Sequence, residues 1–283
     1  MRPELEDVEK SNKKLKIIYA IIITVCVALV LTAITIQIIK IYKESKGNDV
    51  STIGPEDLEK YKKEFDSIFD NKVNYLENNS YKITKLKESE EIVYAGYKEK
   101  TSKLNSYDLN VNIPYINIDN SEINEFNKDI ISTFEDKAKN VLNTQNENII
   151  YTVNYSAYVT NNILSVVIRS TLKEGTKPQR DIVQTYNYDL KNQKAFTIQE
   201  MLDFKGITKQ EANRKIKLEI SDVQKKVEEL AKLGYNVFPR NASSDMYSIN
   251  NVTEYFIGKN NTIYIIYAYG NKNHTSEMDI IIM

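Results

Sequence analysis

The sequence predicts an α+β protein with an N-terminal transmembrane helix, followed by antiparallel β-meanders that pack with amphipathic helices. Three observations lead to this prediction. An uncharged apolar run covers residues 17–39. Several later segments alternate apolar and polar residues with the period of a half-buried strand, and others repeat apolar residues at helical spacing. The 283 residues leave room beyond the run for one domain or two small ones.

The apolar run at 17–39 is long enough to cross a membrane. A helix of this length spans about 35 Å, and the hydrocarbon core of a bilayer is about 30 Å thick. The run lacks the small-residue cleavage site that ends a signal peptide. More basic residues precede the run than follow it closely, so residues 1–16 should form a cytosolic tail. We therefore expect a single-pass cell-membrane protein that contacts lipid through 17–39 and has its C-terminal bulk outside.

Composition excludes several classes of function. The 38 basic and 39 acidic residues give a net charge of −1, and no basic run is present, so we expect no nucleic-acid partner. The single cysteine, Cys26, lies inside the apolar run, and His274 is the only histidine. Zinc sites and Ser-His or Cys-His catalysis therefore lack parts, and we expect no metal, no cofactor and no enzyme activity. Abundant Lys, Asn, Ile and Tyr suggest a low-GC Gram-positive cell.

The first elements after the membrane segment are a linker and a helix. Residues 44–53 are polar, and apolar residues at helical spacing then continue to Leu76, so 40–90 reads as a linker with an amphipathic stalk helix. Strict alternation over 107–115 predicts a half-buried strand. Asp119 and Glu122 resemble a capping pair for the next helix. The apolar face of that helix is Ile123, Phe126, Ile130, Phe134, Ala138 and Val141.

The rest of the chain reads as strands, helices and strands again. Alternation over 151–159, 164–172 and 182–190 predicts a meander, with a turn at Asn161 and Asn162. Capping boxes begin helices at Thr197 and Thr208, and Gly234 ends the second helix. Three last strands are predicted at 252–257, 262–269 and 275–282. The middle one is apolar on both faces and should be central.

The loop at 173–180 is the candidate contact surface. It is long for a hairpin, and long loops on a rigid sheet often carry binding. Tyrosines on the strand that follows could stack against sugar rings. The residues predicted to contact a ligand or partner are Glu174, Lys177, Gln179, Arg180, Tyr186 and Tyr188. The alternatives are a plain solvated connection for the loop and a place in the core for the tyrosines.

A second group of polar residues could carry chemistry. Glu277 and Asp279 share a strand face, with Glu254 expected beside them. Carboxylates so placed could bind calcium or serve a glycosidase. The alternative is the solvated face of a half-buried strand. A Gly-rich phosphate loop is absent from the sequence.

Motifs from residue 107 onward occur in a distinctive order. They read VNIPY at 111–115, LSVVI at 164–168, QTYNYDL at 184–190 and FT followed by Glu200 from Phe196. This order resembles the extracytoplasmic module shared by RsiV-type anti-sigma factors and PdaC-type peptidoglycan deacetylases. Residues 91–194 resemble the PdaC-like N-terminal half of the module, and 195–283 resemble the RsiV-like C-terminal half.

The resemblance implies a non-catalytic sensing or binding domain. RsiV-type proteins bind lysozyme outside the cell and a sigma factor inside, whereas the PdaC module accompanies a separate catalytic domain. Here the 1–16 tail is short for a sigma-binding segment, and one histidine cannot supply the metal ligands of a deacetylase. We therefore expect a surface protein that binds cell-wall glycan (peptidoglycan) or a lysozyme-like protein, and we do not expect a sigma factor as partner. An anti-sigma-type regulator of envelope stress is the alternative, and a hydrolase using Glu254, Glu277 or Asp279 is a third hypothesis.

Overall fold

The computed structural model describes residues 62–76, 83–271 and 274–283. The predicted cytosolic tail 1–16, the transmembrane segment 17–39 and the linker 44–53 lie outside the described residues. Among the helices that are described, none is both long and apolar enough to cross a membrane.

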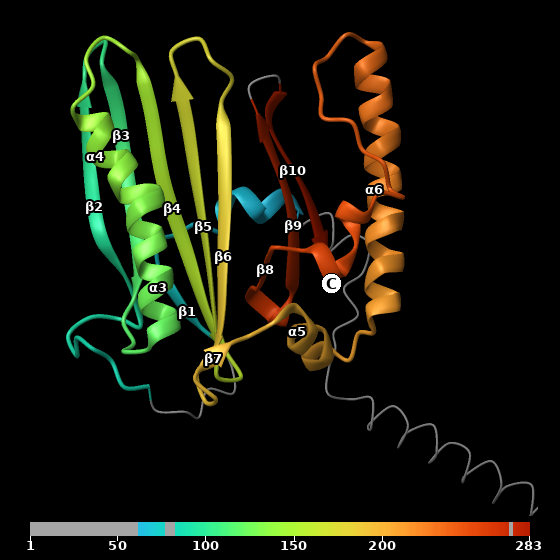
Figure 1. Cartoon of the computed structure of the whole chain (residues 1–283), viewed down its shortest axis with the longest axis horizontal. Coiled ribbons are helices and arrows are strands. Elements are labelled where there is room, and N and C mark those ends of the chain that lie inside the picture. The colour runs from blue at the N-terminus through green and yellow to red at the C-terminus, as the bar shows by residue number, and fades with distance from the viewer. Residues whose placement is uncertain (1–61, 77–82, 272–273) are drawn as a thin grey trace, which may run out of the picture. The chain divides into compact units, whose positions relative to one another are not determined.

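Two β-sheets form the middle of the described fold (Figure 1). Sheet A has the order β2-β3-β4-β5-β6-β7, with β1 beside β4, and sheet B has the order β10-β9-β8. The strands of sheet A are β1 (Val73–Tyr75), β2 (Val93–Lys103), β3 (Tyr107–Ile116), β4 (Ile149–Thr160), β5 (Ile163–Glu174), β6 (Arg180–Asp189) and β7 (Lys194–Ala195). Those of sheet B are β8 (Glu254–Ile257), β9 (Ile263–Asn271) and β10 (His274–Ile282). The predicted α+β class with antiparallel sheets is confirmed for this part of the chain.

One face of sheet A is covered by the helices α3 (Ser121–Ile130) and α4 (Asp136–Leu142), which a π-helical turn (Ile131–Glu135) joins. The six apolar residues predicted for this helical face are all buried. They pack on the alternating apolar residues of β3 and β4, which form the core on this side. The helix begins one residue later than predicted, because the Asn120 side chain accepts the hydrogen bond from the Glu122 N–H.

Two strand pairs of sheet A depart from the predicted antiparallel arrangement, and both involve β4. Both β3 and β1 pair with β4 in parallel, β3 along residues 149–153 and β1 along 157–159. The helices α3 and α4 form the crossover between β3 and β4, and such a crossover returns the chain to the same end of the sheet. The turn at Asn161 and Asn162 is confirmed, with both residues at positive φ as a tight hairpin requires.

The predicted helix through Leu76 is also wrong in its last part. The described helical turns end with a 3-10 turn at Phe65–Ser67, and β1 follows. The helical turns end before Asn71, whose left-handed φ of 58° then turns the chain toward β1. The Asn71 side chain takes the place of a neighbouring strand's backbone carbonyl, because its Oδ1 accepts the hydrogen bond from the Tyr155 N–H of β4 at 3.0 Å.

Sheet B packs on the other face of sheet A, and helix α6 (Lys209–Lys232) covers the outer face of sheet B (Figure 1). The three strands predicted at the C-terminus are confirmed, with β9 in the centre. Phe256 and Tyr264 stack at 4.6 Å between the sheets. Both predicted capping boxes are present, at Thr197 for α5 (Ile198–Lys205) and at Thr208 for α6. Gly234, with a φ of 88°, follows the end of α6 as predicted.

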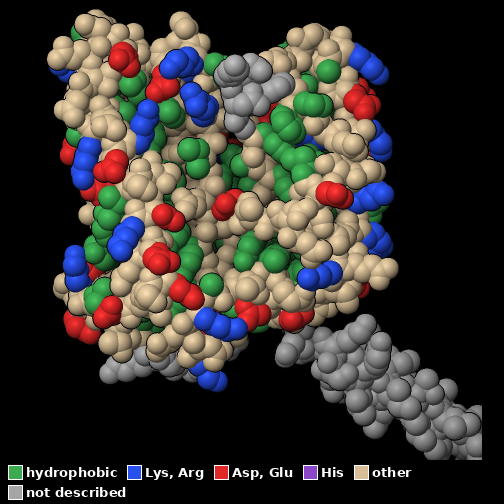
Figure 2. Space-filling model, in the orientation of Figure 1, with side chains coloured by type: hydrophobic (Ala, Val, Ile, Leu, Met, Phe, Trp, Pro, Cys, Tyr) green, Lys and Arg blue, Asp and Glu red, His purple; other side chains and the backbone are tan. Residues whose placement is uncertain are grey.

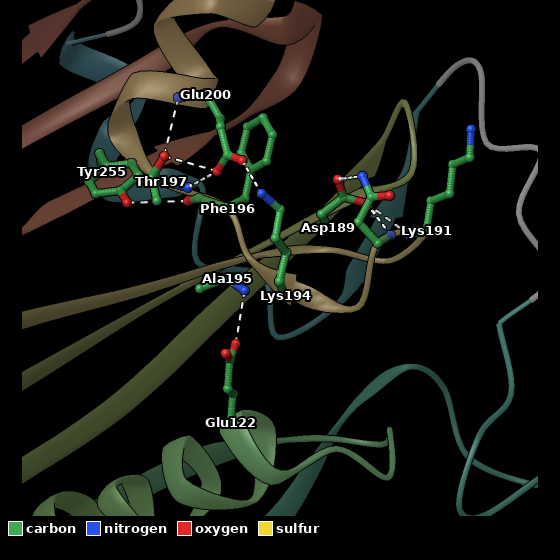
Figure 3. A network of polar contacts seen from close by, with 10 residues as sticks. Glu122, Asp189, Lys191, Lys194, Ala195, Phe196, Thr197, Glu200 and Tyr255 are labelled. Atoms are coloured by element: carbon green, nitrogen blue, oxygen red, sulfur yellow. Dashed lines mark hydrogen bonds and ion pairs between the residues drawn. The ribbon is translucent and has the colours of Figure 1, made fainter.

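A network of polar contacts joins the end of sheet A to helix α5 (Figure 3). Glu200 receives hydrogen bonds from Lys194 and from the backbone of Thr197. Glu122 of α3 accepts from the Ala195 N–H at 2.9 Å, and the Tyr255 hydroxyl donates to the Phe196 carbonyl at 3.2 Å. The boundary predicted between residues 194 and 195 therefore lies within β7, at this network.

Glu254 gives a pH-dependent prediction. Its Oε2 lies between the sheets and accepts from the Thr185 N–H at 2.6 Å and from the Thr185 hydroxyl at 3.0 Å. Burial raises the pKa of Glu254, and these hydrogen bonds offset it only in part. A carboxyl group whose pKa is raised in the folded state stabilises the fold at pH values below its pKa in the unfolded chain, and this stabilisation is lost as pH rises through its pKa in the folded state.

We therefore expect Glu254→Gln to raise the urea midpoint at pH 7 and to leave it nearly unchanged at pH 4. Exposed Glu229→Gln is the matched control, and an equal loss of stability at both pH values would contradict this account.

Candidate functional site

Two rows of polar side chains cross the face of sheet A that looks toward sheet B. The register of the strands places them opposite one another from β2 to β6. One row is Lys100, Asn110, Thr152, Thr171 and Asp181, and the next is Lys98, Asn112, Asn154 and Arg169. Lys98, Lys100 and the neighbouring Ile150 are exposed, so sheet B leaves this part of the face open.

Arg169 is the centre of these rows. Its guanidinium donates to Asp181 at 3.0 Å and forms a second ion pair with Asp66. The Thr171 hydroxyl donates to the other oxygen of Asp181 at 2.8 Å. Desolvation lowers the pKa of Arg169, but the two carboxylates outweigh it and the pKa is raised. The buried Nε of Arg169 has no hydrogen-bond partner among the described residues.

An asparagine cluster adjoins these polar rows at strand β4. Asn154 Oδ1 accepts from Asn71 at 2.9 Å and from Asn112 at 3.5 Å, which fixes the orientation of its amide. The segment 65–71 lies beside these polar rows. Phe65 holds the segment in place because its ring is buried between the two sheets. Phe69 stays half-exposed, with its ring 6.0 Å from the Arg169 guanidinium.

These residues line a partly open hollow of about 170 Å³, which we call the polar hollow. It is lined by Asp66, Phe69, Thr152, Asn154, Arg169 and Thr171. The liquid-state share of one water is about 30 Å³, so the hollow holds several waters or a ring-sized group. A larger hollow of about 390 Å³ lies at the tip of the β2–β3 hairpin, but loop residues such as the exposed Leu104 and Asn105 form much of it.

Chemically, the polar hollow suits a ligand with many hydroxyl groups. Threonine hydroxyls and asparagine amides both donate and accept, Arg169 only donates, and the carboxylates only accept. An aromatic ring beside such groups provides an apolar face of the kind that ligand pockets combine with a few placed polar groups. Two carboxylates beside one guanidinium disfavour an anionic ligand here. Elsewhere, on the face drawn in Figure 2, acidic and basic side chains are interspersed.

The sequence matches no protein-family model and no curated protein. Among solved structures, the chain is similar to a DUF3298 family protein from Pseudomonas aeruginosa PAO1, with 10% identity, 65% of this chain and 85% of that chain covered, and a TM-score of 0.36. It is also similar to a DUF3298 family member from Bacteroides fragilis NCTC 9343, with 12% identity, 62% and 81% coverage, and a TM-score of 0.29. Likenesses this weak leave the site to be argued from the chain's own residues.

The predicted contact loop is tied to its neighbours. Glu174 pairs with Lys137 of α4 at 3.0 Å, and with Lys177 and Arg180 at 3.3 and 3.7 Å. The hydrogen bond from Lys137 is the main cause that lowers the pKa of Glu174. The Gln179 carbonyl accepts from the Ser276 N–H of β10 at 3.2 Å. The loop thus holds α4 and β10, and the Gln179 side chain donates to Asp181, which is not a lining residue of the polar hollow, at 3.4 Å.

The two predicted tyrosines lie on the opposite face of sheet A, in the core. Tyr186 stacks on Phe126 of α3 at 4.3 Å, and Tyr188 is buried. The structure therefore favours the alternative in which they are core residues. The sequence reasoning missed Arg169 and Thr171, although the signal was present. The polar positions of two adjacent strands must lie opposite one another when their apolar positions form the core.

The acidic residues of the hydrolase hypothesis do not meet at one place. Asp279 holds Arg240 through two hydrogen bonds of 2.9 and 3.0 Å, and Glu277 forms a further ion pair with Arg240. Glu254 is bonded instead to Thr185. Within the described part of the chain, no group of three or more His, Cys, Asp or Glu residues could hold a metal ion.

Proposed function

We propose that this chain is a membrane-anchored, extracytoplasmic binding protein of the bacterial cell envelope that recognises a cell-wall glycan. The observation that carries the proposal is the polar hollow, where hydroxyl, amide, carboxylate and guanidinium groups converge beside the Phe69 ring. The anchoring part of the proposal rests on the uncharged run at 17–39 and the basic residues before it.

A glycan fits the groups of the polar hollow better than other ligand classes do. Each sugar ring offers several hydroxyl groups that both donate and accept, together with an apolar face for an aromatic side chain. The groups of the hollow are already oriented, since Asp181 fixes both Arg169 and Thr171 and Asn71 fixes Asn154. Such preorganisation reduces the entropy lost when a ligand binds.

The same contacts favour binding over hydrolysis. A glycosidase needs two carboxyl groups on either side of the scissile bond, one as proton donor and the other as base or nucleophile. Asp66 lines the hollow and Asp181 does not, and both carboxylates are ion-paired to Arg169. They are therefore arranged to hold a guanidinium in place, and only Asp66 can accept a hydrogen bond from a hydroxyl bound in the hollow.

The test measures binding of chitotetraose and of insoluble peptidoglycan to the full-length chain in a non-ionic detergent. Thr152→Val with Thr171→Val keeps the shape of the hollow and removes two hydroxyls. A hydrogen bond contributes about 0.5–1.5 kcal/mol, so we expect the double variant to bind about tenfold more weakly. The exposed Thr253→Val is the matched control and should bind like the wild type.

Two results would count against the proposal. Equal affinity of the double variant and the control would mean that the polar hollow does not take part in recognition. Retention of lysozyme with no retention of either glycan would mean that the ligand is a protein and not a glycan. Unfolding curves of each variant, recorded by circular dichroism, separate a lost contact from a lost fold.

A further inference from the structure

A second cluster lies at the β2 edge of sheet A, on the face that the helices cover. Tyr94 and Tyr97 of β2 and Tyr115 of β3 share this face, and all three are partly exposed. The rings of Tyr94 and Tyr115 lie 6.3 Å apart at an angle of 60°. We call these three residues, together with Glu135, the tyrosine edge.

Two irregularities of the backbone converge on the tyrosine edge. Strand β2 has a bulge between Ala95 and Tyr97, and the Tyr115 ring lies directly over Gly96. A Cβ at Gly96 would be 2.3 Å from Cγ of Tyr115, so only glycine permits this approach. On the helical side, the π-helical turn ends at Glu135. Bulges of both kinds re-aim side chains and are frequent at functional sites.

Glu135 provides a fixed negative charge among the rings. Its side chain is only 12% exposed, accepts the Tyr115 hydroxyl hydrogen bond at one oxygen, and pairs with Lys139 at the other, at 2.6 Å. Desolvation works to raise the pKa of Glu135, but the bonds from Lys139 and Tyr115 outweigh it and lower the pKa. The carboxylate is therefore ionised at neutral pH.

The chain's own ammonium groups already occupy the tyrosine edge. The Lys139 Nζ lies 5.8 Å from the Tyr97 ring centre, and the Lys87 Nζ lies 4.9 Å from that of Tyr94. An ammonium group near an aromatic face is attracted by the ring quadrupole. The Lys139 side chain is 51% exposed, so its ammonium group can move into solvent, and an external ammonium group in its place would keep the buried Glu135 carboxylate paired.

We infer that the tyrosine edge is a second binding site, in which the alkylammonium group of an external ligand takes the place of the Lys139 Nζ. The rings supply the aromatic faces that recognise ammonium and methylated ammonium groups, and Glu135 supplies the counter-charge. This site is independent of the polar hollow, because it lies on the opposite face of sheet A and uses none of the same residues.

Three probes test the inference by titration calorimetry of the full-length chain in a non-ionic detergent at low salt. Choline carries a methylated ammonium, ethanolamine a primary one, and 3,3-dimethylbutan-1-ol has the shape of choline without its charge. We expect at least one cation to bind and the neutral alcohol to bind at least about tenfold more weakly. The cation that binds more tightly shows whether the site prefers a methylated or a primary ammonium group.

Variants separate the parts of the site. Lys139→Ala removes the internal competitor and should tighten binding of the cation by about threefold or more, whereas the exposed Lys128→Ala should have no effect. Glu135→Gln should weaken binding by about tenfold. Glu135→Gln also loses contacts within the fold, so Tyr94→Leu serves as a second variant. It should weaken binding of the cation but not binding of the alcohol. Equal binding of choline and the alcohol, or no cation binding to Lys139→Ala, would overturn the inference.

Discussion

Replacing Arg240 by methionine is expected to lower the free energy of unfolding by about 3–5 kcal/mol. The Arg240 and Asp279 side chains are each only 3% exposed and share two hydrogen bonds. The guanidinium also lies near the stacked rings of Phe238 and Tyr269, at 5.6 and 4.7 Å from their centres. Methionine keeps much of the packing but leaves Asp279 buried without its counter-charge. Urea unfolding followed by circular dichroism measures the loss.

The control for this prediction is Arg214→Met, since Arg214 is an exposed residue of helix α6. It should change stability by no more than about 0.5 kcal/mol. Adding Asp279→Asn and Glu277→Gln to Arg240→Met removes the unpaired charges, and this triple variant should regain part of the loss. If Arg240→Met costs less than about 1 kcal/mol, the ion cluster does not hold the 238–240 segment to β10 as we argue.

Replacing Phe256 by alanine is the second large effect, with an expected cost of about 3–5 kcal/mol. Phe256 is fully buried between the sheets, where it stacks on Tyr264 at 4.6 Å and faces Tyr158 at 6.0 Å. The substitution leaves a cavity in the layer that holds sheet B to sheet A. Thermal and urea unfolding measure the change.

Phe204→Ala is the matched control, because the Phe204 side chain on α5 is 37% exposed. It should cost clearly less than Phe256→Ala. Equal costs at the two positions would mean that the inter-sheet layer contributes no more than a surface contact. Phe256→Leu should fall between wild type and alanine, since it restores most of the lost volume.

The elements that the sequence predicted well depend on local signals. The capping boxes at Thr197 and Thr208 need only residues three positions apart, and both are formed. The alternation of β3, β4 and β5 likewise predicts the side chains that face the helices, but the opposite face of β4 and β5 is also buried near their shared turn, at Ser156, Tyr158, Ser165 and Val167. The apolar face of α3 and α4 followed from helical spacing alone.

The missed features depend on residues that are distant in the sequence. Arg169 meets Asp66 across 103 positions, and Asn154 meets Asn71 across 83. The parallel pairing of β1 with β4 creates this neighbourhood, and the periodicity around β1 had indicated a helix. The polar hollow therefore could not be assembled before the strand order was known. The acidic pair on β10 was noticed, but its partner Arg240 lies in a loop that has no periodic pattern.

The most direct test of the proposed function is a crystal structure of the full-length chain with bound chitotetraose. We predict a sugar ring in the polar hollow, with one face toward Phe69 and hydroxyls within hydrogen-bond distance of Thr171 and Asn154. We also predict that Arg169 keeps its ion pair with Asp181 in the complex. A sugar bound at another surface, with the hollow filled only by water, would contradict the proposal.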